Sequence, residues 1–397
     1  MSSAERAGDY DACPPDSLKE RISPLLPAIR ERAARIESER RVPVETIEGL
    51  AAAGLFRALA PRQFGGDERE LLAVHEALID LAAACASTAW VGALFAFHAL
   101  MIQWLDERAQ RDVWGDGPNA LVASSIAPLG SAVRVGDHFR LDGKWPLSSG
   151  INHAKWVFVL ANEAGPSEPV RSRACLVPIS DCTILDDWHA AGLKGTGSHS
   201  LVMSNVVVPE YRSETMVAVN EGTARGMIGR SPLIRRTWKP ILYYSFCPVA
   251  IGCALETINL FREYTRSRKA ANTGELYREK PSTLLRLGES VGEVDLALAA
   301  LRRDVREIED CEGLPAARID YVIARVSYDS AYITELCSRA VARLFRGSGG
   351  HAVYERNPLQ RLFRDTHTIT QHVAMDFDAA REQYARTLIE NLQVELG

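Results

Sequence analysis

The C-terminal part of the chain carries the pattern that most restricts the fold. From about Pro240 onward, apolar residues recur at the spacing of an amphipathic helix. The pattern runs through four long stretches: Ala250–Arg268, Ser282–Cys311, Pro315–Phe345 and Pro358–Leu396. Because only short links separate them, neighbouring helices are expected to run in opposite directions, and the sequence predicts an antiparallel four-helix bundle.

A second set of helices is predicted at the N-terminus, and strands between the two sets. Helical spacing of apolar residues continues to about residue 114, whereas short runs rich in β-branched residues follow from about Asn119 to Pro209. The prediction is a mostly α protein with a central β domain that resembles a small barrel or sandwich. The expected divisions are an N-terminal helical domain (1–118), a β-barrel domain (119–218) and a C-terminal four-helix bundle domain (219–397). Gly- and Arg-rich residues 219–239 predict a long excursion, which could form a lid.

Composition argues against several classes of function. The chain has 397 residues, a net charge of −5 and a pI near 6.0, whereas nucleic-acid binding favours a strongly basic surface. Its eight cysteines form no Cys-x-x-Cys pair, so no metal site is expected. The polar start lacks the apolar core of a secretion signal, and no apolar run approaches the roughly 20 residues of a membrane span. We expect a cytoplasmic protein with reduced thiols.

Several local segments resemble the acyl-CoA dehydrogenase superfamily, in the order in which that family has them. They are Gly54-Leu-Phe with Phe64-Gly65-Gly66, Gly192-Leu-Lys-Gly-Thr-Gly-Ser-His-Ser200, Gly347-Ser-Gly-Gly350, and Arg364-Asp365. The resemblance covers nearly the whole chain. It implies the fold of that family: a helical domain, a small β-barrel and a C-terminal four-helix bundle.

One position departs from the chemistry of that family. Some members place their catalytic glutamate about nine residues past the arginine that corresponds to Arg364, and here that place holds Val373, preceded by His372. A carboxylate there would abstract the acidic proton next to a thioester carbonyl. A valine cannot accept a proton, and a histidine offers different acid–base chemistry. The chain therefore resembles a flavin dehydrogenase whose chemistry has changed.

A closer resemblance is to the group D flavin monooxygenases, the oxygenase components of two-component systems. It rests on Cys85-Ala-Ser-Thr-Ala-Trp90 followed by His98, and on Trp145-Pro-Leu-Ser-Ser-Gly-Ile-Asn-His-Ala-Lys-Trp156. In such enzymes a Trp-x-x-Ser-Ser-Gly edge faces the flavin ring, which implies cofactor contacts for Trp145, Ser148 and Ser149. In those enzymes, a histidine on an N-terminal helix and another on the last helix face the side of the flavin that reacts with oxygen. Catalytic roles would therefore fall on His98, His372 and Ser149.

The resemblance implies a monooxygenase that receives reduced FMN or FAD from a separate NAD(P)H:flavin reductase. With O2 it would hydroxylate or oxidise a small aromatic or heteroatom-bearing substrate through a C4a-hydroperoxyflavin. The protein would have to exclude water from this adduct. A serine hydroxyl would hold the proton of the reducible ring nitrogen, and imidazoles would donate to the oxygens or deprotonate a phenol. The cofactor would carry the hard chemistry, and the protein would orient and shield it.

The flavin phosphate needs cations and backbone donors. Gly349 and Gly350 can bring bare N–H groups to an anion. Arg268 ends the first bundle helix, where the equivalent arginine of related folds often serves the flavin, sometimes across a subunit boundary. Thr196 and Ser198 are expected at the ring edge or the phosphate. The usual assembly of the family implies a homotetramer.

Ordinary interpretations and other functions stay open. His98 lies on an apolar helix, where a histidine is commonly a core residue, and His372 could bond Asp376 one helical turn on. The serine pair could cap a turn, and Gly349-Gly350 could end a helix. An acyl-CoA dehydrogenase with a relocated carboxylate would use the region of Glu256, and a non-catalytic scaffold would keep only the fold. The sequence leaves open the substrate, FMN against FAD, and which serine contacts the flavin.

Overall fold

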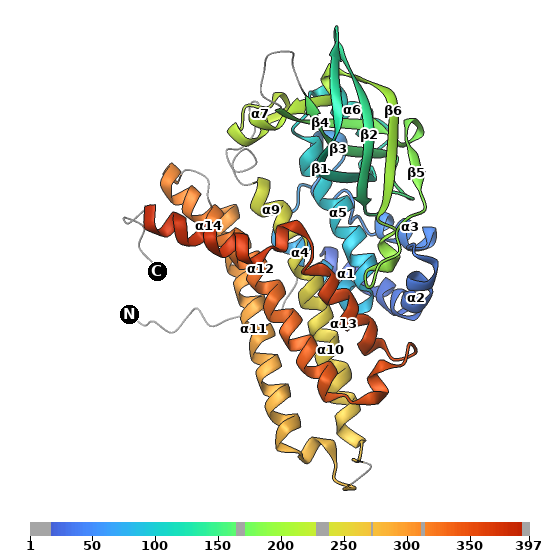
Figure 1. The fold of residues 1–397 in the computed structure, drawn as a ribbon, viewed down its shortest axis with the longest axis vertical. Coiled ribbons are helices and arrows are strands. Elements are labelled where there is room, and N and C mark those ends of the chain that lie inside the picture. The colour runs from blue at the N-terminus through green and yellow to red at the C-terminus, as the bar shows by residue number, and fades with distance from the viewer. Residues whose placement is uncertain (1–16, 164–170, 228–237, 271–272, 311–313, 391–397) are drawn as a thin grey trace.

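The computed structural model describes residues 17–163, 171–227, 238–270, 273–310 and 314–390. Figure 1 shows the β domain at one end of the molecule and the long helices at the other, with the N-terminal helices packed beside both. The order of elements is helices, strands and helices again. This confirms the predicted class, a mostly helical protein with a central sheet.

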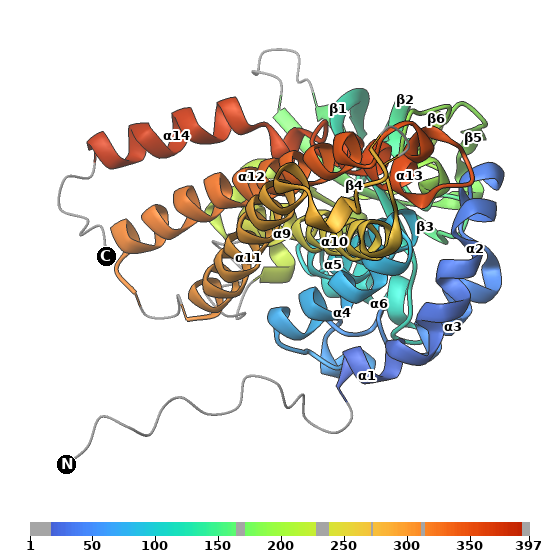
Figure 2. The same ribbon diagram turned by 90° about the horizontal axis from the view of Figure 1, so that it is seen from below.

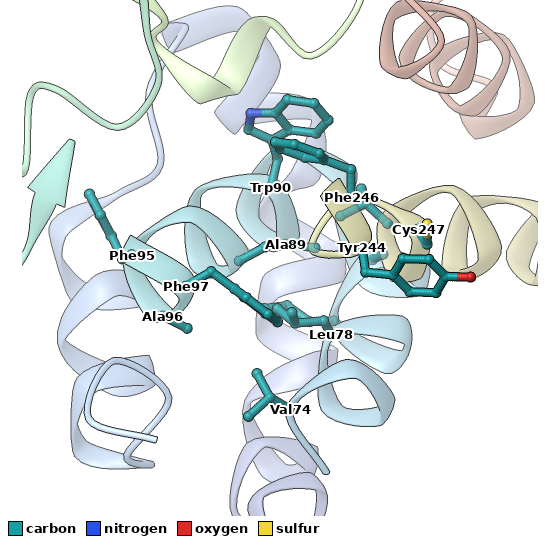
Figure 3. Packing of buried hydrophobic residues seen from close by; sticks show 14 of the residues in the cluster. Val74, Leu78, Ala89, Trp90, Phe95, Ala96, Phe97, Tyr244, Phe246 and Cys247 are labelled. Carbon is teal, nitrogen blue, oxygen red and sulfur yellow. The ribbon is translucent and has the colours of Figure 1, made fainter. Parts of the chain in front are cut away.

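The N-terminal helices include one that is apolar on nearly all sides. They are α1 (Leu18–Ile22), α2 (Leu26–Glu39), α3 (Val44–Ala52), α4 (Leu71–Ala84), α5 (Ala86–Ile102) and α6 (Glu107–Trp114). Nearly every residue of α5 is buried, because it contacts α4, a bundle helix and the first strand. Figure 3 shows its residues Trp90, Phe95 and Phe97 in the core.

The strands form one open mixed sheet. They are β1 (Val122–Val135), β2 (His138–Ser148), β3 (Trp156–Glu163), β4 (Arg171–Pro178), β5 (Thr183–Leu185), β6 (His199–Pro209) and β7 (Ser213–Thr215). Their order is β5-β6-β2-β1-β3-β4-β7, with β1 and β3 parallel and the other pairs antiparallel. The edge strands β5 and β7 do not pair with each other within the described residues, so the sheet of the predicted β domain is open there.

The C-terminal part of the chain forms a second set of helices in the described residues. They are α7 (Met216–Glu221), α9 (Trp238–Tyr244), α10 (Cys247–Ser267), α11 (Pro281–Glu309), α12 (Ala316–Gly347), α13 (Pro358–Ile369) and α14 (Phe377–Glu390). α10 contacts α4, α5, α11, α12 and α13, and Figure 2 shows it among these helices. The span Trp238–Ser267 is long and apolar enough to cross a membrane, but 78% of its most apolar window is buried inside the fold. It is a core helix here. Within the predicted excursion, residues 228–237 lie outside the described part.

The predicted single helix Pro358–Leu396 is wrong. The helix ends at Ile369, the short turn Val373–Met375 follows, and α14 begins at Phe377. Two side chains cap the new starts: the ring of His372 accepts from Ala374 N at 3.2 Å, and the carboxylate of Asp376 accepts from Ala379 N at 3.1 Å. Because both residues cap backbone, His372 lies in a connection and does not bond Asp376 along a helix.

The cysteines of the described residues are free thiols. Cys85, Cys175, Cys247, Cys253 and Cys337 are buried, and Cys182 is partly buried. Burial raises the pKa of each of these thiols, to about 12 for Cys175 and Cys182.

Candidate active site

Four segments far apart in the sequence meet beside the β domain. They are the middle of α5, the end of β2, the turn 192–198, and the connection after α13. Gly150 lets β2 end directly on α5: its φ is +71°, and an added Cβ would lie 2.7 Å from the ring of Phe95. Gly192 lets the turn lie on α13, since an added Cβ would meet Arg364 O at 2.3 Å.

A chain of hydrogen bonds joins these segments through side-chain hydroxyls. Trp90 Nε1 donates to Ser149 Oγ at 3.1 Å. Ser149 Oγ lies 2.7 Å from Ser198 Oγ, which lies 2.6 Å from Thr196 Oγ1. Thr196 Oγ1 donates to Leu193 O at 2.8 Å, ending the chain on the backbone. The structure thus brings together Ser149, Ser198 and Thr196, which the sequence predicts for the site, and we call this set with Trp90 and Leu193 the hydroxyl chain.

Two other residues at the end of β2, Leu147 and Ser148, have features that are typical of a functional site. Ser148 Oγ is buried and has no hydrogen-bond partner among the described residues. Next to it, the side chain of Leu147 is 63% exposed, and its backbone has a φ of +62°, a conformation that L residues rarely adopt. Strain and orphaned polar atoms of this kind gather at functional sites. The strained, exposed Leu147 and the unpaired hydroxyl of Ser148 therefore mark the end of β2 as part of the candidate site.

His372 lies on the aromatic side of the same cluster. Its ring centroid is 4.3 Å from that of Phe246 and 5.6 Å from that of Trp90, and Figure 3 shows these two rings beside each other. Burial lowers the pKa of His372 to about 4. Because Nδ1 accepts from Ala374 N, the proton of the neutral ring sits on Nε2. Within the described residues Nε2 has no partner, so His372 offers an N–H donor to a ligand.

His98 is more enclosed than expected for a group that meets substrate directly. Its Nδ1 lies 2.6 Å from Val122 O, and its Nε2 lies 3.0 Å from Ser124 Oγ. Burial lowers its pKa to about 4. Since a carbonyl only accepts, Nδ1 carries the proton, and Nε2 accepts the hydroxyl proton of Ser124. Sequence reasoning missed Ser124, which is partly exposed on β1 and is the group that His98 orients.

Trp145 does not keep its predicted cofactor contact. Its ring is fully buried in the core of the β domain, and its Nε1 donates to Leu160 O at 2.7 Å. It fills the space beside Gly130, where an added Cβ would lie 1.9 Å from the indole. A ring enclosed on all sides has no face left for a flavin, so Trp145 supports β2 from behind.

Arg268, Gly349 and Gly350 lie together, but far from this cluster. The guanidinium of Arg268 lies 4.4 Å from the ring centroid of Tyr264, whose hydroxyl donates to Ser348 O at 2.8 Å. An added Cβ at either glycine would meet nothing within 4 Å, so the backbone there is open. α10 starts next to Phe246 and ends before Arg268, and its 21 residues rise about 30 Å.

A buried carboxylate fixes the turn that carries Thr196 and Ser198. Asp365 Oδ1 accepts from Leu193 N at 2.6 Å, and Arg364 donates to Ala191 O at 2.7 Å. Leu193 has a left-handed φ of +50°. The Arg-Asp pair therefore docks the turn onto α13, the helix that leads to His372.

The relocated carboxylate of a dehydrogenase is not at this site. Glu256 faces α2, where it pairs with Arg30 at 3.3 Å, and burial raises its pKa. Phe246 lies ten positions earlier on the chain, about 15 Å along the helix axis. The position predicted for a C-terminal base holds Val373, whose side chain is exposed and apolar.

Comparisons with known proteins agree with this geometry. The family model of the acyl-CoA dehydrogenase N-terminal domain matches residues 26–114, and that of the acyl-CoA dehydrogenase C-terminal domain matches residues 244–377. The flavin-dependent monooxygenase oxygenase subunit HsaA of Mycobacterium tuberculosis is 34% identical over 364 residues, which cover 90% of this chain and 92% of that protein. The oxygenase component of p-hydroxyphenylacetate 3-hydroxylase from Acinetobacter baumannii is 32% identical over 376 residues, covering 94% and 89%.

Solved structures show the same likeness. The crystal structure of the HsaA monooxygenase from M. tuberculosis matches with a TM-score of 0.87 at 31% identity, over 96% of this chain and 98% of that one. XiaF from Streptomyces sp., in complex with FADH2 and glycerol, matches with a TM-score of 0.86 at 28% identity, over 94% and 95%.

Proposed function

The chain belongs to the acyl-CoA dehydrogenase family, and we propose that it works there as the oxygenase component of a two-component flavin-dependent monooxygenase. Its curated relatives carry that activity in their names. One observation in the structure supports it most: the site joins a neutral imidazole N–H and a chain of hydroxyls. Neither position expected for a dehydrogenase base brings a carboxylate to it, because Val373 is apolar and Glu256 pairs with Arg30 on α2.

The residues of the site suit a reduced flavin. Leu147 offers an apolar surface for the ring, and Ser148 and Ser149 offer oxygens for its polar edge. Bound reduced FMN or FAD would supply the electrons that activate O2. The protein would hold the proton of the reducible nitrogen on a serine, donate from His372 Nε2 toward oxygen, and exclude water with Phe246 and Trp90.

We propose a small aromatic substrate, phenolic in character. Ser124 gives its proton to His98, so its oxygen accepts from an incoming hydroxyl. The name of the p-hydroxyphenylacetate 3-hydroxylase relative supports such a substrate. The description of both curated relatives as an oxygenase subunit or component supports a separate NAD(P)H:flavin reductase as partner. The need for this partner and the free thiols support a cytoplasmic location.

We further propose a homotetramer in which subunits share flavin sites. Arg268, Gly349 and Gly350 lie about 30 Å from Phe246 along α10, and a ribityl chain is far shorter than this. These residues would therefore serve the phosphate of a neighbouring subunit's flavin. α11 exposes Leu284, Leu285, Val291 and Leu296, an apolar stripe that a second copy of the chain would cover.

Two experiments test these proposals. The protein is mixed anaerobically with reduced FMN or FAD, then with O2 and a panel of phenols, and hydroxylated product and H2O2 are counted per flavin. Product formation supports a monooxygenase, whereas dye reduction with an acyl-CoA and no hydroxylation would support a dehydrogenase. For the shared sites, co-expressed His372→Ala and Arg268→Ala subunits should regain part of the activity that each variant lacks alone. No regain would place both residues in one subunit's site.

A further inference from the structure

We propose that the hydroxyl chain has a fixed direction, which leaves Ser149 able only to accept further hydrogen bonds and so selects reduced flavin over oxidised flavin. This inference rests on the proposed function and adds a role for Ser198 and Thr196, which lie one and two links behind Ser149.

The direction follows from the two ends of the chain. At one end, Leu193 O can only accept, so the 2.8 Å contact with Thr196 Oγ1 is a hydrogen bond only if Thr196 gives its single hydroxyl proton. Thr196 must then accept from Ser198 across 2.6 Å. Ser198, with its own proton used, must accept from Ser149 across 2.7 Å.

The other end fixes the same direction. Trp90 Nε1 can only donate, and it donates to Ser149 Oγ. Ser149 thus accepts one proton from Trp90 and gives its own to Ser198. One lone pair of Ser149 remains, and a lone pair can only accept.

Reversing the chain would be unfavourable. If Ser149 turned its proton toward a ligand, either its oxygen and that of Ser198 would face each other at 2.7 Å without a proton, or the chain would reverse. Reversal would leave Thr196 Oγ1 and Leu193 O facing each other at 2.8 Å as two acceptors. Leu193 O is held in place by two further donors, Thr196 N and Trp188 Nε1. Water has little access to the hydroxyl chain, since Ser149, Ser198 and Thr196 are all buried.

This polarity matches one redox state of flavin. The central ring nitrogen N5 carries a hydrogen in reduced flavin and a lone pair in oxidised flavin. An acceptor-only Ser149 bonds the first and repels the second. An oxygenase component that takes up reduced flavin and releases oxidised flavin would gain from this difference.

Equilibrium binding tests the inference without turnover. Kd values for oxidised FMN and for anaerobic reduced FMN are measured by dialysis for the wild type, Thr196→Val, Thr196→Ser and Thr257→Val. Thr196→Val keeps the β-branched shape but frees Ser198, and then Ser149, to turn. We expect the ratio of oxidised to reduced Kd to fall about tenfold, the worth of roughly one buried hydrogen bond. Thr196→Ser keeps the hydroxyl and should restore the ratio.

Thr257→Val is the matched control. Thr257 is buried and donates to Cys253 O at 2.8 Å, the same kind of bond away from the hydroxyl chain, and its loss should leave the ratio unchanged. Thermal unfolding checks that each variant is folded. If Thr196→Val does not fold, Ser198→Ala interrupts the hydroxyl chain at the residue next to Ser149. If the wild type binds reduced flavin but the ratio of oxidised to reduced Kd is unchanged in the folded variants, this inference is wrong and the proposed function still stands. A wild type that binds neither form overturns the proposed function as well.

Discussion

Replacing Asp365 with asparagine should change how stability depends on pH. Asp365 is enclosed between α13 and the turn 192–194, and burial raises its pKa from 3.8 to about 6, although Leu193 N–H, Arg361 and Arg364 act in the opposite direction and Glu37 adds to the rise. Because the pKa is higher in the folded than in the unfolded protein, the associated stability is fully present below the unfolded pKa. It is lost as the pH rises through about 6.

The size of the effect follows from the two values. The gap between 3.8 and about 6 corresponds to about 3 kcal/mol, at about 1.36 kcal/mol per unit. Roughly half of it, about 1.4 kcal/mol, falls between pH 5 and pH 8. Asparagine has the same shape and no proton to lose, and its oxygen can still accept from Leu193 N. The free energy of unfolding of the wild type minus that of Asp365→Asn should therefore fall by about 1.4 kcal/mol from pH 5 to pH 8.

Urea unfolding at pH 5, 6.5 and 8, at one protein concentration, measures this difference. Asp378→Asn, at an exposed position on α14, reports the loss of a surface carboxylate. A difference for Asp365→Asn that stays flat across the three pH values would show that the turn does not close over the carboxylate in solution, and the docking of the turn onto α13 would have to be abandoned.

Three further changes test the site. His372→Asn should keep the fold but divert the electrons of reduced flavin from product to H2O2, and an unchanged product yield per flavin would remove His372 from the mechanism. Because its pKa is lowered to about 4, the wild-type His372 should stay neutral until the pH falls to about 4. Ser149→Ala leaves Trp90 Nε1 buried without its acceptor, so the free energy of unfolding should drop by about 1–3 kcal/mol, measured in urea. Gly192→Ala places a Cβ 2.3 Å from Arg364 O and should destabilise the fold by about 3 kcal/mol, whereas an unchanged melting temperature would contradict the close contact.

The sequence predicts the long elements because their periodicity is local. α10, α11 and α12 agree with the predicted stretches to within a few residues. The break after Ile369 was missed, although Thr366, Thr368 and Thr370 bond back to carbonyls and weaken a helix. His372 and Asp376, which cap the turn and the helix that follow, are the sequence signal for this break.

The candidate site was predictable only as residue types. The serine and threonine hydroxyls and His372 came from motifs, and the structure brings them together. Sequence patterns do not tell which side of a strand faces a cavity, so Trp145 was assigned to the cofactor although it faces the core. Ser124 was missed because its pairing with His98 depends on how α5 packs against β1.

The buried thiols have a consequence for an enzyme of this kind. A monooxygenase releases peroxide whenever reduced flavin meets oxygen without substrate, and peroxide attacks thiolates far faster than thiols. In the described part of the chain, five of the six thiols are buried, and burial raises the pKa of all six, which favours the protonated form. Peroxide formed in failed turnovers should therefore oxidise these five buried thiols slowly.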